Sequence, residues 1–166
     1  MVSFDGAWSR SETHAFLDAA VIPVRLGCHA PDGGLWMLSL WYRFHDGQIQ
    51  CATSKDADVV SYLRRNDDIC FEVSTNTPPY MGVRGAGTAT IEESGAKAAL
   101  GALVDRYLGT RDAEMAQWLL REEREEVTIT IDPSRVYTWD FTQRMESVSE
   151  HAPGATAGEP ASPKYD

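Results

Sequence analysis

Two tight-turn signals within residues 24–54 constrain the fold of this chain more than any other feature. Pro31-Asp32-Gly33-Gly34 and His45-Asp46-Gly47 separate three runs of apolar and β-branched residues. An Asp-Gly pair between such runs is the strongest short-range signal for a β-hairpin. The segment therefore predicts a tight antiparallel meander with strands at residues 21–29, 35–44 and 48–53.

The rest of the chain adds further strands and a few helices. Ser9 or Ser11 is expected to cap a helix ending near Ala20, after a loose lead-in over residues 1–8. Periodicity predicts helices at 56–65, 94–108 and 110–124, and strands at 69–74, 80–91, 126–132 and, after a break at Pro133, 136–141. Six or seven strands with sparse helices indicate a mainly β fold, an antiparallel β-barrel with flanking helices. We expect one domain over residues 1–146 and a disordered Pro/Gly/Ala-rich tail over 147–166.

Composition excludes several functional classes. A formal charge of −10 over 166 residues argues against a nucleic-acid partner, because phosphate binding needs a basic surface. No apolar run is long enough to cross a membrane, and the first residues lack a signal-peptide pattern, so a cytoplasmic location is expected. Cys28, Cys51 and Cys70 lack metal-binding spacing and are expected to be small buried residues in strands; no metal site is predicted.

The strand over residues 35–44 is apolar on both faces, which a strand with one solvated face would not be. Its even-numbered residues, Trp36 to Phe44, can fill the barrel. The odd-numbered residues then need another cover, which could be a helix, a second subunit or a flat ligand. Met37, Ser39, Trp41 and Arg43 suit an aromatic ligand with hydrogen-bonding edges.

Two further segments carry candidate ligand-binding residues. Gly82, Gly85 and Gly87 interrupt the strand over 80–91, which indicates either bulges or a cofactor ring or partner pressing on the backbone near Arg84. Thr53, Ser54 and Lys55 precede a helix, so hydroxyls, an ammonium and a helix N-terminus can converge there on a phosphate. The alternative is that Asp56 caps this helix itself. No motif for a catalytic nucleophile or an acid–base pair is present, so catalytic residues stay unassigned.

Several short motifs occur in the order typical of one known superfamily. They are Arg25-Leu26-Gly27-Cys28, Asp32-Gly33, Ser39-Leu40-Trp41-Tyr42, Cys51-Ala52-Thr53-Ser54, Leu63-Arg64-Arg65-Asn66-Asp67, Cys70-Phe71-Glu72-Val73, Gly82-Val83-Arg84-Gly85-Ala86-Gly87 and Val136-Tyr137-Thr138-Trp139-Asp140-Phe141. Over roughly residues 20–142 the chain resembles the pyridoxamine 5′-phosphate oxidase-like, FMN-binding split-barrel superfamily, and most closely its flavin/deazaflavin oxidoreductase branch.

This resemblance implies a six-stranded split barrel that forms a homodimer with two cofactor sites in grooves between the subunits. Members bind FMN or the deazaflavin F420, and some bind haem. The ring would lie on the strand carrying Ser39 and Trp41, the phosphate would lie near Thr53, and the partner's glycine-rich strand would close the site. The implied reaction is hydride transfer to or from a small organic substrate.

The sequence departs from the family pattern at the phosphate loop. The family places a serine four residues after the threonine and a basic residue two further on, and those positions hold Ala57 and Val59. Lys55 could substitute for the missing cation. Three hypotheses follow: an FMN- or F420-dependent oxidoreductase, a non-enzymatic flavin or haem carrier or sensor with a degenerate phosphate site, and a dimeric scaffold with a vestigial groove.

Overall fold

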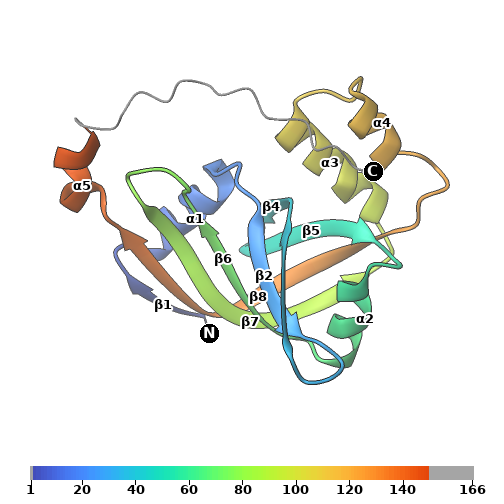
Figure 1. Cartoon of the computed structure of the whole chain (residues 1–166), viewed down its shortest axis with the longest axis horizontal. Helices are drawn as coiled ribbons and strands as arrows, with labels where there is room; N and C mark the ends of the chain where they lie inside the picture. The colour runs from blue at the N-terminus through green and yellow to red at the C-terminus, as the bar shows by residue number, and fades with distance from the viewer. Residues whose placement is uncertain (1, 150–166) are drawn as a thin grey trace, which may run out of the picture.

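A single eight-stranded sheet organises the chain (Figure 1). The computed structural model describes residues 2–149, with side chains as far as Glu146. Seven strands follow the order β3-β2-β6-β7-β8-β5-β4, and β1 pairs with the free side of β8. The strands are β1 (Ser3–Gly6), β2 (Val24–His29), β3 (Leu35–Leu40), β4 (Tyr42–His45), β5 (Gln48–Ser54), β6 (Asp68–Ser74), β7 (Met81–Glu92) and β8 (Glu126–Asp140).

The sheet becomes a split barrel because one predicted strand bends at Trp41. Its first arm, β3, pairs antiparallel with β2, and its second arm, β4, pairs antiparallel with β5. These arms lie at opposite ends of the strand order, yet only Trp41 separates them in sequence. Six chain segments therefore form the barrel when the two arms are counted as one bent strand. The mainly β, split-barrel prediction is confirmed, and the prediction of one straight strand over 35–44 is wrong.

Two features of β8 differ from the sequence prediction. Residues Ser3–Gly6, expected to be a loose lead-in, form a parallel strand along Arg135 to Thr138 of β8. Pro133 does not break β8, because it lies where the register with β7 shifts between Ala86 and Gly87. A proline is tolerated at such a bulge, since no regular ladder hydrogen bond is lost there.

The barrel interior holds the main hydrophobic core. Alternate residues of every barrel strand point into it, among them Leu26, Ile49, Phe71, Val83 and Ile129. The largest fully buried side chain is that of Tyr42, whose hydroxyl donates to the carbonyl oxygens of Leu17 at 2.8 Å and Ala20 at 3.2 Å. Burial raises the pKa of the Tyr42 phenol far above its ordinary value. Its hydroxyl therefore stays a donor that ties the C-terminal end of α1 (Arg10–Ala19) to the core.

The helices begin where local capping allows. Ser9, one of the two caps that the sequence offers, caps α1 and forms a capping box with Glu12, and these hydrogen bonds lower the pKa of Glu12. The helix α2 (Asp58–Arg65) has Ala57 at its N-cap without a side-chain cap, so the expectation that Asp56 starts or caps it is wrong. The helix α3 (Ala96–Leu108) ends at Gly109 in a left-handed conformation.

The helix predicted over 110–124 is shorter than expected. The helix α4 covers only Glu114–Leu119, with Ala113 at its N-cap. Thr110 accepts a hydrogen bond from the backbone of Asp112 in the turn that precedes the helix. A second small cluster of Leu100, Val104 and Ala116 packs α3 against α4.

Helices cover only part of the outer surface of the barrel. The helix α3 packs on β4, β5 and β8, which buries Thr128 and Thr130 although they alternate with core residues (Figure 1). The helix α2 contacts β2 and β7, and α1 contacts β4 and β7, but their buried residues belong to the interior core: Leu17, Val59, Val60 and Leu63. The outer face of β2, β3, β6, the first half of β7 and the second half of β8 holds mostly exposed or half-buried residues.

The chain continues after the barrel as α5 (Thr142–Ser149), so regular backbone extends slightly past the predicted domain end at residue 146. The predicted disordered tail lies, from residue 150 onward, outside the described residues. Within the described part, no helix is long and apolar enough to span a membrane. The same residues contain no group of three or more His, Cys, Asp or Glu side chains placed to hold a metal ion.

Candidate functional site

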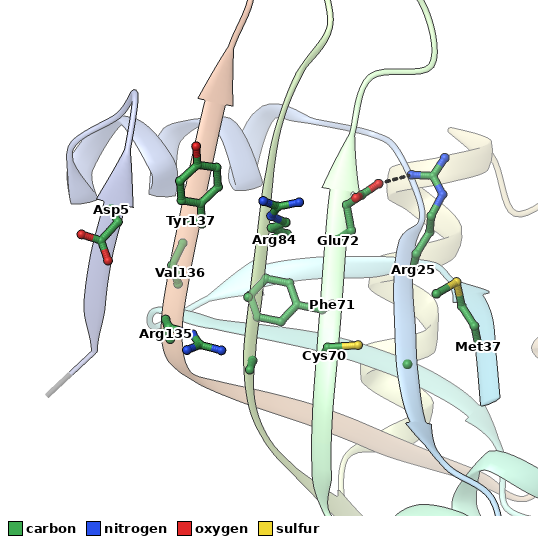
Figure 2. A pocket seen from close by; sticks show the side chains of 13 residues that line it. Asp5, Arg25, Met37, Cys70, Phe71, Glu72, Arg84, Arg135, Val136 and Tyr137 are labelled. Atoms are coloured by element: carbon green, nitrogen blue, oxygen red, sulfur yellow. Dashed lines mark ion pairs between the residues drawn. The ribbon is translucent and has the colours of Figure 1, made fainter. Parts of the chain in front are cut away.

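A cavity of about 630 Å³ lies on the uncovered outer face of the sheet (Figure 2). Six strands contribute to it: β1, β2, β3, β6, β7 and β8. A volume of this size is within the usual range of small-molecule sites. Its lining residues are Asp5, Arg25, Gly27, Met37, Cys70, Phe71, Glu72, Arg84, Gly85, Ala86, Arg135, Val136 and Tyr137.

Strand register explains why residues so far apart in sequence meet here. Paired positions on neighbouring strands share a face of a sheet, so a row of partners forms one line across it. The upper row runs across β2, β6, β7, β8 and β1 as Arg25, Glu72, Arg84, Tyr137 and Asp5. The next row on the same face runs from β3 to β8 as Met37, Gly27, Cys70, Ala86 and Arg135.

The two rows differ in chemistry, which gives the cavity a small-residue floor and a charged border. Gly27, Cys70 and Ala86 are small residues on three adjacent strands, so the cavity has a low floor between the longer residues; Gly27 itself is buried, with the Cys70 sulfur over it. Met37 lies beside them with 68% of its surface exposed. A second cavity of about 280 Å³ shares Gly27, Met37 and Cys70 with the first and extends to Leu35 and Trp36. Together they form one groove, called here the outer-face groove.

Arg25 is neutralised within the groove. Its guanidinium lies 3.5 Å from a carboxylate oxygen of Glu72 and donates to Asn76 at 2.6 Å and to Ser74 at 3.3 Å. Ser74 in turn donates to the same Glu72 oxygen at 2.8 Å. The network fixes the Arg25 side chain and pairs its charge with a carboxylate, as Figure 2 shows for the ion pair with Glu72.

Arg84 and Arg135 are held differently. The guanidinium of Arg84 lies 4.9 Å from the ring centre of Tyr137 and 5.8 Å from that of Trp139. Such cation–π contacts position a guanidinium without using its N–H donors. Among the described residues, neither Arg84 nor Arg135 has a hydrogen-bond acceptor or a carboxylate partner. Both side chains keep free donors at the border of the groove.

The predicted phosphate turn exists but lies apart from this groove. Ser54 ends β5, and Lys55 follows it in the turn to α2. The Lys55 ammonium lies 3.4 Å from a carboxylate oxygen of Glu93, whose other oxygen is 3.7 Å from Arg64. Glu93 therefore occupies the position of an anion between two cations. Thr53, Ser54 and Lys55 line none of the cavities on the outer face.

Trp41 is also separate from the groove. Its ring stacks on Tyr107 of α3, with the centroids 5.1 Å apart and the planes 6° from parallel, and it packs against the small α3–α4 cluster. The backbone of Tyr42 donates to the Tyr107 hydroxyl at 3.2 Å, which fixes the bend. The expectation that Trp41 shares an exposed face with Met37 and Ser39 is wrong, because the strand breaks at this residue and a helix covers the indole.

The other predicted site residues divide between the groove and its surroundings. Met37 and Arg84 line the groove together, as the predicted site requires. Ser39 is exposed and pairs with Arg25 across β2 and β3, next to the groove. Trp36, expected inside the barrel, is 42% exposed and packs edge-on against Tyr62 of α2.

The glycines of β7 make room for atoms of the same chain. A Cβ at Gly85 would lie 2.4 Å from the carbonyl oxygen of Arg135 and 2.7 Å from the Phe71 ring. A Cβ at Gly82 would meet the Trp139 indole at 2.7 Å, and Gly87 lies at the bulge. The bulge, one of the two alternatives left open by the sequence, accounts for Gly87, and packing against atoms of the same chain, which the sequence did not suggest, accounts for Gly82 and Gly85.

The cysteines fall into two classes. Cys28 and Cys51 are buried as predicted, and burial raises both thiol pKa values, that of Cys51 to about 12. Cys70 is exposed on the groove floor, so the expectation of burial is wrong for this residue. It points outward because its neighbours Ile69 and Phe71 point into the barrel.

Sequence reasoning missed Arg25, Arg135 and Tyr137 as components of the site. The alternation of Val136 and Thr138 with Arg135 and Tyr137 already indicates that the latter two point away from the core. What the sequence could not supply was the register that places them beside Arg84. No pattern along the chain distinguishes the paired Arg25 from the unpaired arginines.

Comparison with known proteins agrees with this architecture. No family model matches the chain, and no curated protein sequence matches it. Among solved structures, a conserved hypothetical protein from Mycobacterium tuberculosis is similar, with a TM-score of 0.69 and 23% identity over 93% of this chain and 94% of that one. An F420 reductase has a TM-score of 0.57 and 20% identity over 74% and 94% of the two chains. A putative pyridoxamine 5′-phosphate oxidase from Listeria innocua has a TM-score of 0.58 and 17% identity over 78% and 96%.

This chain has the pyridoxamine 5′-phosphate oxidase-like split-barrel fold. Other proteins with similar structures are named as a heme binding protein from Mycobacterium smegmatis, at 18% identity, and an FAD-binding protein from Mesorhizobium loti, at 17% identity. Proteins that share this split-barrel fold therefore include ones named for flavins, for F420 and for haem.

Proposed function

We propose that this split-barrel protein binds a flavin-type cofactor, FMN or F420, in the outer-face groove and acts as an oxidoreductase on a small organic substrate. The observation that carries the proposal is the groove itself. It combines a floor of small residues, the exposed Met37 and two guanidinium groups that have no acceptor among the described residues. Similar structures named as F420 reductase and FAD-binding protein support this choice of cofactor class.

The residues present fit a planar ring better than a compact ligand. Gly27, Cys70 and Ala86 lie side by side on three strands and leave a shallow floor on which a ring can rest. Met37 on one side and Tyr137 on the other offer apolar surface for its edges. A bound flavin or deazaflavin would supply hydride transfer, while the residues of the groove bind it, orient it and exclude water.

We further propose that a second copy of the chain closes the groove. Leu35 is 87% exposed and Met37 68%, and both lie on β3 with the partly exposed Trp36. Contiguous apolar residues of this kind mark an interaction surface. Burial by a second copy would enclose the ring and explain why none of the helices within residues 2–149 covers this part of the sheet. Sedimentation of the wild type and of Leu35→Asp tests this, since the variant should be monomeric if β3 forms the interface.

One observation favours a second candidate function, a non-enzymatic haem carrier. His29 and Met37 both line the smaller of the two cavities, and both are side chains that bind haem iron in other proteins. A similar structure is named as a heme binding protein. In this case the groove would hold haem without a substrate site.

Absorbance titration of the purified protein with FMN, F420 and haemin separates these functions. Saturable binding of FMN or F420, followed by reduction of the bound FMN by a nicotinamide nucleotide or reoxidation of reduced F420 by an acceptor, supports the oxidoreductase. A Soret shift with haemin that is lost in His29→Ala or Met37→Leu supports the carrier. Absence of binding by all three compounds contradicts both.

A further inference from the structure

We infer that the outer-face groove recognises an anionic group of its ligand, a phosphate or carboxylate, and that Arg84 and Arg135 bind it instead of Lys55. The identity of the ring rests on the proposed function, whereas the anion site can be tested without any ring compound. The charged end of the ligand then lies at the border of the groove and not at the turn before α2.

The charge partners of the basic residues support this assignment. Lys55 is engaged by Glu93, and Arg25 is engaged by Glu72. The guanidinium groups of Arg84 and Arg135 have no acceptor among the described residues. A bound phosphate at Lys55 would have to displace the Glu93 carboxylate, whereas one at Arg84 and Arg135 displaces only water. The free donors of the arginines are therefore the better anion site.

The positions of the two arginines suit a single shared anion. Arg84 pairs with Tyr137 across β7 and β8, so Arg135, two residues before Tyr137, is its diagonal neighbour on the same face. Diagonal neighbours lie roughly 7–8 Å apart at the backbone, which two long side chains easily bridge. In Figure 2 the Arg135 side chain extends from β8 toward β7, where Arg84 stands. Guanidinium groups also match the geometry of phosphate and carboxylate oxygens.

The local charge of the groove differs from that of the whole protein. The chain carries a formal charge of −10, so its overall field repels anions. Within the groove, Glu72 neutralises Arg25. The remaining charged residues are Arg84, Arg135 and Asp5, and Asp5 stands at the β1 edge beyond Tyr137 (Figure 2). Glu72 lies opposite Arg84 across β6 and β7, and Asp5 is a diagonal neighbour of Arg135 across β8 and β1, but neither carboxylate forms an ion pair with these two arginines. An anion bound between the arginines therefore relieves their mutual repulsion.

The first test uses inorganic pyrophosphate as the probe at low ionic strength. Binding to the folded state should raise the melting temperature of the wild type by roughly 3–6 °C when the concentration is about ten times Kd. The rise should disappear in Arg84→Gln and in Arg135→Gln and persist in Lys55→Gln. Arg65→Gln, an exposed arginine of α2 outside the groove, is the matched control for the loss of one charge. An equal rise in all variants, no rise in the wild type, or a loss only in Lys55→Gln overturns the inference.

The second test identifies the source of the anion. Kd is compared for FMN and riboflavin, which differ by the phosphate, and for F420 and its deazariboflavin core, which lacks the phosphate and carboxylate-bearing tail. We expect roughly tenfold weaker binding of the anionic member in each groove-arginine variant, with the neutral member unaffected. Equal losses for both members of a pair overturn the anion assignment. Pyrophosphate binding without binding of any ring compound contradicts the proposed function and leaves the anion site supported.

Discussion

Replacing Gly85 by alanine tests why β7 contains glycines next to the groove. The added Cβ would lie 2.4 Å from the Arg135 carbonyl oxygen and within 2.8 Å of two Phe71 ring atoms. Neither neighbour moves easily, because the carbonyl belongs to β8 and the Phe71 side chain is 3% exposed. Overpacking of this kind costs about 1–3 kcal/mol in the free energy of unfolding. At 2–4 °C per kcal/mol for a chain of this size, the melting temperature should fall by roughly 2–12 °C.

Urea denaturation followed by circular dichroism measures this loss, and the slope with denaturant should be unchanged. Gly34→Ala is the matched control, since the nearest atom to its Cβ is a carboxylate oxygen at the end of the exposed Asp32 side chain, 3.0 Å away, and we expect a change within about 0.5 kcal/mol. If Gly85→Ala keeps its stability but loses affinity for FMN or F420, the glycine makes room for a ligand. Our explanation from internal packing would then be wrong.

Three other predictions concern the core, the thiols and acid stability. Tyr42→Phe should lower the free energy of unfolding by about 1–2 kcal/mol, because the hydrogen bonds from its hydroxyl to Leu17 and Ala20 are lost. The hydroxyl of Tyr62 has no such hydrogen bond among the described residues, so Tyr62→Phe should leave the free energy of unfolding unchanged. Equal effects of the two substitutions would refute this prediction. At pH 8 a thiol reagent should modify only Cys70 in the folded protein, because Cys28 and Cys51 are buried. A pKa of about 12 also leaves only roughly one in 10⁴ of the Cys51 thiols ionised at this pH. Labelling that persists in Cys70→Ser would contradict this prediction. Hydrogen bonds from Thr142 hold the pKa of Asp140 below its ordinary value, so the carboxylate stabilises the fold above its unfolded pKa and loses this effect as pH falls through its lower folded pKa. In Asp140→Asn the free energy of unfolding should therefore depend less on pH below about pH 4. An unchanged pH dependence would refute this prediction.

The fold could be predicted to a large extent because its signals are local. The turns at Asp32-Gly33 and Asp46-Gly47 lie where the structure has its hairpins, and Gly33 and Gly47 both adopt the positive φ that these turns require. Alternating residues in the last strand, such as Ile129 and Ile131, also point into the core as expected. Ser9 and Glu12 form the capping box that such a pair favours.

The errors have a common cause, which is that they depend on contacts between distant segments. Nothing near Trp41 in sequence breaks the strand; the bend exists because β3 pairs with β2 and β4 pairs with β5. The strand at Ser3–Gly6 forms only because β8, more than a hundred residues later, offers an edge. Covering of Trp41 by Tyr107 is likewise a tertiary contact. Local propensity contains none of this information.

The sequence could identify some residues of the candidate site, but it could not tell which of them are free to bind a ligand. Met37 and Arg84 could be selected from their strands, and the structure brings them together in the groove. The distinction between a free and an engaged cation could not be made, because Glu93 pairs with Lys55 from 38 residues away. Charge pairing therefore decides which of the predicted basic residues is available to a ligand.

The location of the bound ring is the most direct test of the central claim, and the ε-methyl groups of methionine report it by NMR. Met37 lies in the groove, whereas Met115 is exposed on α4 outside it and provides an internal reference. In protein labelled with ¹³C at these methyls, FMN or F420 should shift the Met37 signal, assigned with Met37→Leu, by the ring current of the bound cofactor and leave Met115 in place. Saturable cofactor binding without a change at Met37, or with a larger change at Met115, would contradict the account.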